Sequence, residues 1–136
     1  MRIAAITLSL LAAASLLAQG EVRRGGSPWA SIEDDGSIRI RGSLAGRVEG
    51  DGSVQEGGRQ VGRIESDGAI RCKGSLCGRV EGDGTLRRGG SIIGRIEADG
   101  TLRRHGSVWG RMEGGARTTR QQHRIAALLF FFSGEF

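Results

Sequence analysis

The sequence predicts an all-β fold, a closed radial array of short β-hairpins built from a 16-residue tandem repeat. Three observations support this prediction. Each unit contains two short stretches in which apolar and polar side chains alternate, separated by turn residues. The first and last units are incomplete, and each contains the half that the other lacks. One glycine series recurs every sixteen residues without insertion or deletion, at Gly26, Gly42, Gly58, Gly74, Gly90 and Gly106. A linear β-solenoid is the alternative arrangement of the same units.

Residues 1–20 differ in composition from the rest and are expected to be a secretory signal peptide. Arg2 is the only charged residue, residues 3–17 are apolar or small, and Ala18-Gln19-Gly20 places small residues where a signal peptidase cleaves. A membrane anchor is the alternative, but this apolar run is shorter than the ~20 residues that a spanning helix needs. We therefore expect a secreted, periplasmic or cell-surface protein with no membrane span in the mature chain.

Residues 21–115 are expected to form the β-hairpin repeat domain. In the unit 90–105, a two-residue period places Ile92 and Ile96 on the same inward face. Asp99-Gly100 then supplies the positive-φ position of a tight hairpin, from which the second strand returns. The sequence contains five such Asp-Gly hairpins in succession.

The inward positions of the repeat form two columns of aliphatic side chains. A single unit contributes only a few of them, so the units must share one central core. The first column contains Ile32, Val48, Ile64, Val80, Ile96 and Met112. The second contains Ile38, Val54, Ile70, Leu86 and Leu102.

Charges of both signs are evenly interleaved along the repeats. The formal net charge is +5, but residues 21–115 carry 16 basic and 14 acidic side chains. Such mixing does not give the basic stripe that nucleic acid requires, so no nucleic acid partner is expected. The recurrent Arg and Glu positions are interpreted as cross-strand ion pairs on the outer face rather than as a binding face.

The repeated unit resembles that of the five-fold β-flower proteins, which are secreted bacterial domains. The shared pattern is Gly-Arg-Ile-(Asp/Glu)-x-Asp-Gly-(Ser/Thr)-(Ile/Val)-Arg, found between Arg47 and Arg103, together with Phe130-Phe131-Phe132. The resemblance covers roughly residues 26–132. It implies a radial array of hairpins around a pseudo-symmetry axis and no established activity. The departures from the pattern are Ser31, Gln55-Glu56 and Gly114-Gly115-Ala116.

Cys72 and Cys77 both replace non-Cys residues of one unit and are predicted to form a disulfide. They flank a turn that can bring opposite strands within reach, and export provides an oxidising compartment. A metal pair is the alternative, but tetrahedral zinc needs four ligands, and only His105 and His123 remain available. We expect both histidines at the solvated surface. No metal, cofactor or catalytic residue is predicted, because the turns offer too few oxygens for calcium and no Ser-His-acid motif is present.

Residues 116–136 are expected to be a basic link followed by a Phe-rich segment that packs on the repeat core. Residues 125–132 are the strongest apolar run after the leader, and eight residues cannot span a bilayer as a helix. Residues 21–115 contain no Phe, so a strand or short helix here would add the missing aromatic volume. An exposed patch for a partner or a membrane surface is the alternative.

The expected function is that of a secreted, non-enzymatic structural or binding domain. Its expected partner is a cell-surface glycan or protein, and Trp29 and Trp109 are the stacking candidates if it binds carbohydrate or peptidoglycan. A small hydrolase is a second alternative, which no constellation of residues supports. The two tryptophans are five periods apart, so a solenoid separates them by about 24 Å. A closed ring instead brings their rings within about 10 Å.

Overall fold

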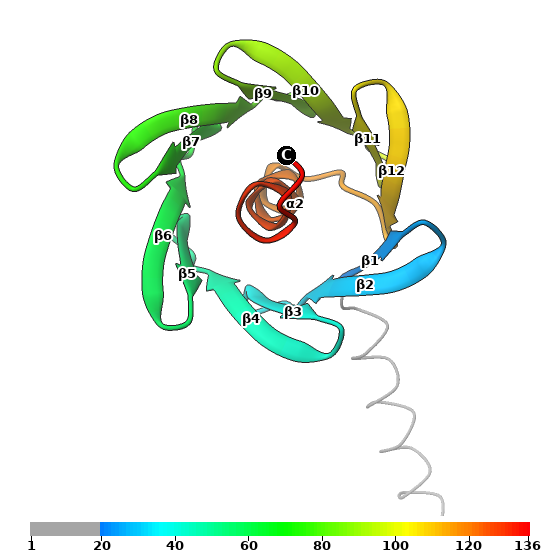
Figure 1. Cartoon of the computed structure of the whole chain (residues 1–136), viewed down its shortest axis with the longest axis horizontal. Helices are drawn as coiled ribbons and strands as arrows, with labels where there is room; N and C mark the ends of the chain where they lie inside the picture. Colours follow the sequence, from blue (N-terminus) through cyan, green and yellow to red (C-terminus); the bar gives the residue numbers. More distant parts are fainter. Residues whose placement is uncertain (1–19) are drawn as a thin grey trace, which may run out of the picture.

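Each strand of this protein pairs antiparallel with both of its neighbours, so the sheet closes on itself. The computed structural model describes residues 20–136, in which twelve strands form a ring of six hairpins around one helix (Figure 1). The closed radial array is therefore confirmed, and the linear solenoid is excluded. The predicted signal peptide lies outside the described residues, except for Gly20.

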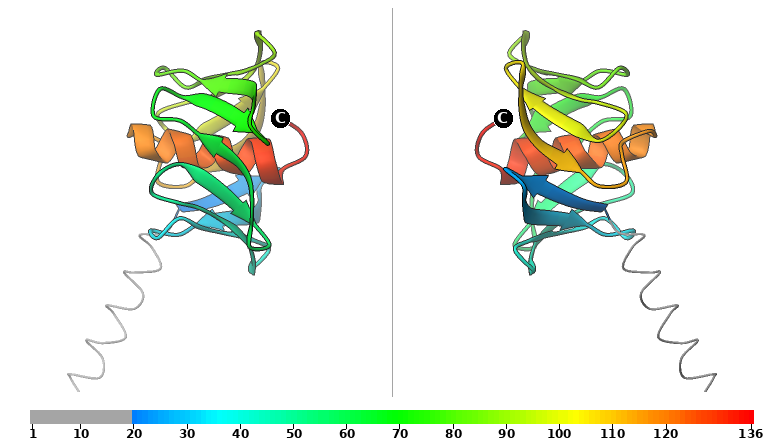
Figure 2. Two further views of the ribbon diagram at one scale, coloured as in Figure 1. Left: turned by 90° about the vertical axis from the view of Figure 1, so that its left-hand side faces the viewer. Right: turned by 90° about the vertical axis from the view of Figure 1, so that its right-hand side faces the viewer.

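The strands are short, with four to six residues each. In chain order they are β1 (Gly20–Arg24), β2 (Ser27–Ile32), β3 (Ser37–Ile40), β4 (Ser43–Val48), β5 (Ser53–Glu56), β6 (Arg59–Ile64), β7 (Ala69–Cys72), β8 (Ser75–Val80), β9 (Thr85–Arg88), β10 (Ser91–Ile96), β11 (Thr101–Arg104) and β12 (Ser107–Met112). The helix, α2 (Thr119–Phe132), runs through the middle of the ring (Figure 2).

Two kinds of turn alternate around the ring. Two-residue turns with positive φ at both positions, such as Gly25-Gly26, join the two strands of each hairpin; we call them tip turns. Glu-x-Asp-Gly segments, which we call linker turns, connect one hairpin to the next. In the first of them the Gly36 N–H donates to the Glu33 carbonyl oxygen over 2.9 Å, and the Asp35 carboxylate accepts from the Ser37 N–H over 2.9 Å. All five predicted Asp-Gly turns are present as the linker turns, each of which joins two antiparallel strands. They lie at the opposite end of the strands from the tip turns.

The ring closes at a seam between β1 and β12, where no turn joins the two strands. Val22 pairs with Met112 and Arg23 pairs with Arg111, and the Glu113 N–H donates to the Glu21 carbonyl oxygen over 2.7 Å. The sequence predicts that the half unit at residues 22–24 pairs with the half unit that ends at Glu113, and this pairing is confirmed. The pairing leaves neither terminal strand with an open edge.

The loss of Asp-Gly after β12 marks the point where the chain leaves the ring. The Gly115 N–H donates to the Met112 carbonyl oxygen over 3.2 Å, and the Ala116 N–H donates to the Ala98 carbonyl oxygen over 3.0 Å. These bonds turn the chain inward. A capping box between Thr118 and Gln121 then starts α2.

The core lies between the ring and the helix. Both predicted aliphatic columns are buried, and the helix contributes Ile125, Leu128 and Leu129, which have no exposed surface. A helix fits here because every hairpin presents the same short apolar face to the axis. The Phe-rich run is helical, and its first ring, that of Phe130, is also buried.

The aromatic rings of the C-terminal residues lie against a column of repeat glycines. A side chain at Gly62, for example, would meet the Phe131 ring, because a Cβ placed there would lie 2.3 Å from Phe131 Cζ. The same relation holds for Gly46 with Phe132, Gly78 with Phe130 and Gly94 with Phe136. The glycines of this column therefore provide the space that the aromatic rings fill.

Candidate functional site

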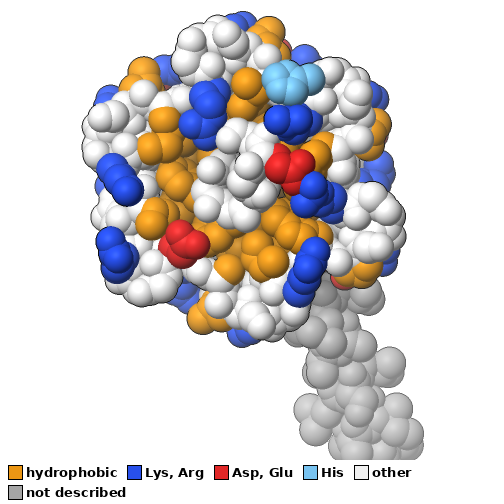
Figure 3. Space-filling view, in the orientation of Figure 1, with side chains coloured by type: hydrophobic (Ala, Val, Ile, Leu, Met, Phe, Trp, Pro, Cys, Tyr) orange, Lys and Arg blue, Asp and Glu red, His pale blue; other side chains and the backbone are white. Residues whose placement is uncertain are grey.

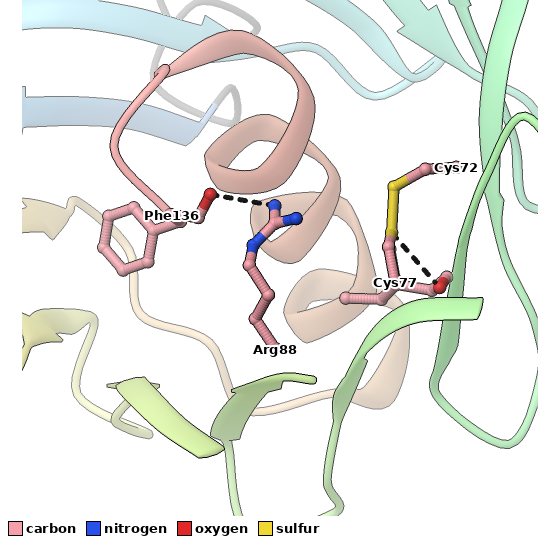
Figure 4. Close-up of a disulfide and its surroundings, with 5 residues drawn as sticks. Cys72, Cys77, Arg88 and Phe136 are labelled. Atoms are coloured by element: carbon pink, nitrogen blue, oxygen red, sulfur yellow. Dashed lines mark hydrogen bonds between the residues drawn. A yellow bond between two sulfur atoms is a disulfide. The ribbon is translucent and has the colours of Figure 1, made fainter. Parts of the chain in front are cut away.

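The two cysteines form the predicted disulfide across the tip turn between β7 and β8. Their Cα atoms are 5.8 Å apart, and Cys77 packs against the core (Figure 4). Beside them, Arg88 Nη2 donates to the Phe136 carbonyl oxygen over 2.8 Å, so the end of the chain is held against the ring. The disulfide has a structural role in one hairpin.

Trp29 and Trp109 meet across the seam. Their ring centroids are 5.4 Å apart with the planes at 89°, which confirms the predicted proximity. Trp29 is only 7% exposed. The centroid of the Trp109 ring also lies 5.3 Å from the Phe136 centroid and 5.0 Å from Cζ of Arg24. The indole N–H of Trp109 donates to Oε1 of Glu135 over 3.2 Å. A sugar could therefore stack on these rings only after Glu135 and Phe136 had moved away.

A pocket of about 280 Å³ lies between the start of α2 and the linker turns. His123, Arg124 and Ser66 are among the residues that line it. His123 is half-buried, contrary to our expectation of a solvated side chain, because it lies on the face of α2 that turns toward the ring. Burial lowers the pKa of His123, although the charge of Asp67 acts in the opposite direction.

Ser66 and His123 are the candidate nucleophile and base of this pocket. A serine nucleophile needs a base within hydrogen-bonding reach. Among the hydrogen bonds of residues 20–136, none joins Ser66 to His123. In the same part of the chain, no group of three or more His, Cys, Asp or Glu side chains is placed to hold a metal ion.

Most arginines on the outer face of the ring pair with a carboxylate of a linker turn. In the first complete unit, Arg39 Nε lies 2.8 Å from Glu33 Oε2, and Arg47 Nη2 lies 2.8 Å from Asp35 Oδ2. The same two kinds of pair recur around the ring, as Arg71–Glu65, Arg87–Glu81, Arg103–Glu97, Arg63–Asp51, Arg79–Asp67 and Arg95–Asp83. This pattern supports the interpretation of these positions as structural ion pairs, each contributing little because the side chains are partly exposed.

The charges at the two ends of the ring differ in sign. Among residues 20–136, most acidic residues lie in the linker turns, and Glu21 and Glu113 lie at the same end of the seam. The exceptions are at the tip end, where Glu56 lies opposite Arg59 and Glu135 pairs with Arg24. At the tip turns, the exposed side chains of Arg41, Arg59 and Lys73 form no ion pair among residues 20–136. The linker end is therefore rich in carboxylates, whereas the tip end carries free positive charge.

The tip end also exposes a ring of apolar side chains. They occupy the second position of the strand that follows each tip turn, and the exposed fractions are 64% for Leu44, 61% for Leu76, 58% for Ile92 and 62% for Val108. Pro28 is also exposed at this position, where Gln60 is the polar exception. We call the six tip turns together with these six residues the tip face. Figure 3 views the ring from this end and shows hydrophobic side chains near the centre and between hairpins, Lys and Arg both near the centre and around the rim, and isolated acidic side chains among them.

The prediction that Ile92 points inward was wrong. A β-bulge lies between Ile92 and Gly94, so two residues of β10 oppose one residue of β9. The bulge shifts the alternation by one residue, and Ile93 rather than Ile92 packs against the core. The same shift occurs in the other hairpins. On β8, for instance, Leu76 and Gly78 oppose the consecutive residues Arg71 and Ile70 of β7, so Cys77 is the extra residue. A strict two-residue period cannot reveal this apolar ring.

Comparisons of the chain with family models, with curated proteins and with solved structures find no match. The function must therefore be argued from the surface and the pocket described above.

Proposed function

We propose that this protein is a secreted binding domain, not an enzyme, and that it contacts its partner through the tip face. The observation that carries the proposal is the ring of four large apolar side chains, each more than half exposed at one repeat position. Single exposed apolar residues are common on protein surfaces, but a repeated set with free positive charges beside it is typical of an interaction surface.

The fold does not require apolar side chains at this position. Gln60 occupies it in the hairpin formed by β5 and β6, which pairs in the same way as the others. The bulged residue beside it, here Val61, already contributes the core contact. The exposed position is thus free of packing constraints, which supports a role in binding.

The alternatives have less support. Glycan stacking would use Trp29 and Trp109, but Trp29 is buried and the residues at 135–136 cover part of Trp109. A hydrolase would need an activated nucleophile in the pocket beside His123. The composition of residues 1–20 supports secretion. Membership in the β-flower family is also a proposal, supported by the radial array of hairpins, although this ring has six of them.

The test uses residues 20–136, which contain all twelve strands and the helix that fills the ring. Labelled protein is incubated with cell envelopes of the source organism and then sedimented. We expect the variant Leu44→Ser, Leu76→Ser, Ile92→Ser, Val108→Ser to lose most of its binding, because it removes the exposed apolar ring but no buried side chain.

The matched control carries serines at the other end of the ring, at Gly50, Gly82 and Ala98. These three positions are equivalent to Ser66, so the repeat already accepts serine there. The control should bind as the unmodified protein does. Equal binding by the tip-face variant would show that this surface is not the contact site.

A further inference from the structure

We infer that the partner of the tip face is the surface of a phospholipid bilayer with anionic headgroups. This inference rests on the proposed function, since it names the partner of that same surface. Three features of the tip face carry it: its planarity, its free positive charge and its exposed apolar side chains.

The tip face is planar because of the repeat. Leu44, Leu76, Ile92 and Val108 occupy the same position in hairpins that repeat around the closed ring, so they lie at one level along its axis. A flat partner can contact all of them at once. A single peptide or a small ligand can reach only one or two, because the helix and the C-terminal residues fill the middle of the ring.

In three of the six tip turns a long polar side chain occupies a costly backbone conformation. The first residue of the tip turn has φ of 51° at Arg41, 53° at Lys73 and 50° at His105. In the alternate hairpins the same position is occupied by glycine, at Gly25, Gly57 and Gly89. Glycine adopts this conformation without strain, whereas other residues do not. Side chains that project from strained positions are typical of functional sites, and here they alternate around the ring.

Charge and apolar surface together match a membrane interface. Lys and Arg beside a bilayer are attracted to anionic headgroups, and apolar side chains next to them enter the boundary between headgroups and acyl chains. Arg41, Arg59 and Lys73 are exposed for the first interaction, and the apolar ring for the second. The exposed apolar ring lies only at the tip end of residues 20–136, and this fixes the orientation of the domain on the bilayer.

A second copy of the chain is a poorer partner. Stacking of a tip face on a linker end would pair opposite charges, but the exposed second position of the linker turns is filled by small or polar residues. These residues are Asp34, Gly50, Ser66, Gly82 and Ala98. They offer no apolar surface to cover the exposed ring of the tip face.

The test measures binding of residues 20–136 to vesicles of phosphatidylcholine with and without phosphatidylglycerol, by co-sedimentation. We expect binding to the anionic vesicles, weakened by added NaCl, and little binding to phosphatidylcholine alone. The variant Arg41→Gly, Lys73→Gly restores the glycine of the other tips without strain. It should bind about 25-fold more weakly, since each basic residue near an anionic surface strengthens binding about fivefold.

The control variant Arg117→Ser, Arg120→Ser removes the same charge from exposed positions at the linker end. We expect it to bind within about twofold of the unmodified protein, and equal weakening of both variants would overturn the inference. Absence of binding to anionic vesicles at low salt would also overturn it. The four-serine variant of the apolar ring distinguishes the two proposals. If the protein did not bind anionic vesicles but this variant still lost its binding to cell envelopes, the tip face would be a binding surface for a partner other than a bilayer. Sedimentation of the protein alone as a polymer would point to a second copy.

Discussion

Trp29 and Trp109 are separated by eighty residues in the sequence, and they meet edge to face with centroids 5.4 Å apart. The contact exists because β1 and β12 pair at the seam of the ring, the one junction that no turn holds together. Elsewhere the same repeat position is filled by smaller residues, namely Ala45, Val61, Cys77 and Ile93. The largest side chains at this repeat position therefore lie at the seam, where they add to the backbone pairing of β1 with β12.

Replacement of Trp109 should weaken the seam more than an equivalent change elsewhere. We expect Trp109→Ala to lower the free energy of unfolding by about 2–3 kcal/mol, because it removes a half-buried aromatic residue together with its edge-to-face contact. Val61→Ala, at the same repeat position away from the seam, should cost about 1 kcal/mol. Urea denaturation measures both, and equal losses would contradict the special role of the seam.

The contact between the helix and the glycine column gives a second prediction. Gly62→Ala places a Cβ 2.3 Å from Phe131 Cζ and 2.5 Å from the Arg71 carbonyl oxygen, so the ring or the helix must shift. We expect a loss of about 2 kcal/mol or more in the free energy of unfolding. Gly50→Ala is the control, since no atom lies within 4 Å of its added Cβ and Ala98 occupies the equivalent position. Thermal unfolding of the two variants would reveal the difference, and equal stability would contradict the contact.

Much of this architecture could be predicted from the sequence because its period is unbroken. The Asp-Gly turns, the two aliphatic columns and the closure of the ring follow from the spacing of a few residue types. The helical state of residues 119–132 could not be predicted, because an apolar run of this length suits either a strand or a buried helix.

The tip face was missed for a different reason. It depends on a bulge in each hairpin, and a bulge changes which side chains are exposed without any change in composition. Ile92 therefore looked like a core residue in the sequence. The signal that could have indicated the exposed position is Gln60, the polar residue that one hairpin tolerates there.

The disulfide should add moderate stability. A bridge that closes so short a loop contributes about 2 kcal/mol in the chain-entropy description. In the variant Cys72→Ala, Cys77→Val, the valine reproduces the residue at position 61, so the core contact is kept. We expect its melting temperature to fall to that of the unmodified protein under reducing conditions. A reductant should have no further effect on the melting temperature of the variant. The prediction would be contradicted if neither the substitutions nor reduction of the unmodified protein lowered the melting temperature.

Acid should destabilise the ring through its linker turns. The carboxylates of the five linker-turn aspartates each accept the backbone N–H of the residue two places later, and this bond lowers their pKa below the usual 3.8. Nearby arginines lower the pKa further. The unfolded chain lacks these interactions and therefore binds protons more tightly. The stabilisation is thus complete above the usual pKa and is lost as pH falls through the lowered values.

Substitution of all five aspartates by asparagine isolates this effect. The residues are Asp35, Asp51, Asp67, Asp83 and Asp99. An asparagine side chain can accept the same backbone N–H but does not titrate in this range, so the turn geometry is kept while the proton linkage is removed. We expect the free energy of unfolding of the unmodified protein to fall more steeply between about pH 5 and pH 3 than that of the variant. The glutamates are common to both proteins. His123, whose pKa the charge of Asp67 raises, is replaced by Gln in both proteins so that its titration does not enter the comparison. Parallel pH profiles from urea denaturation would show that the linker turns do not carry the acid sensitivity.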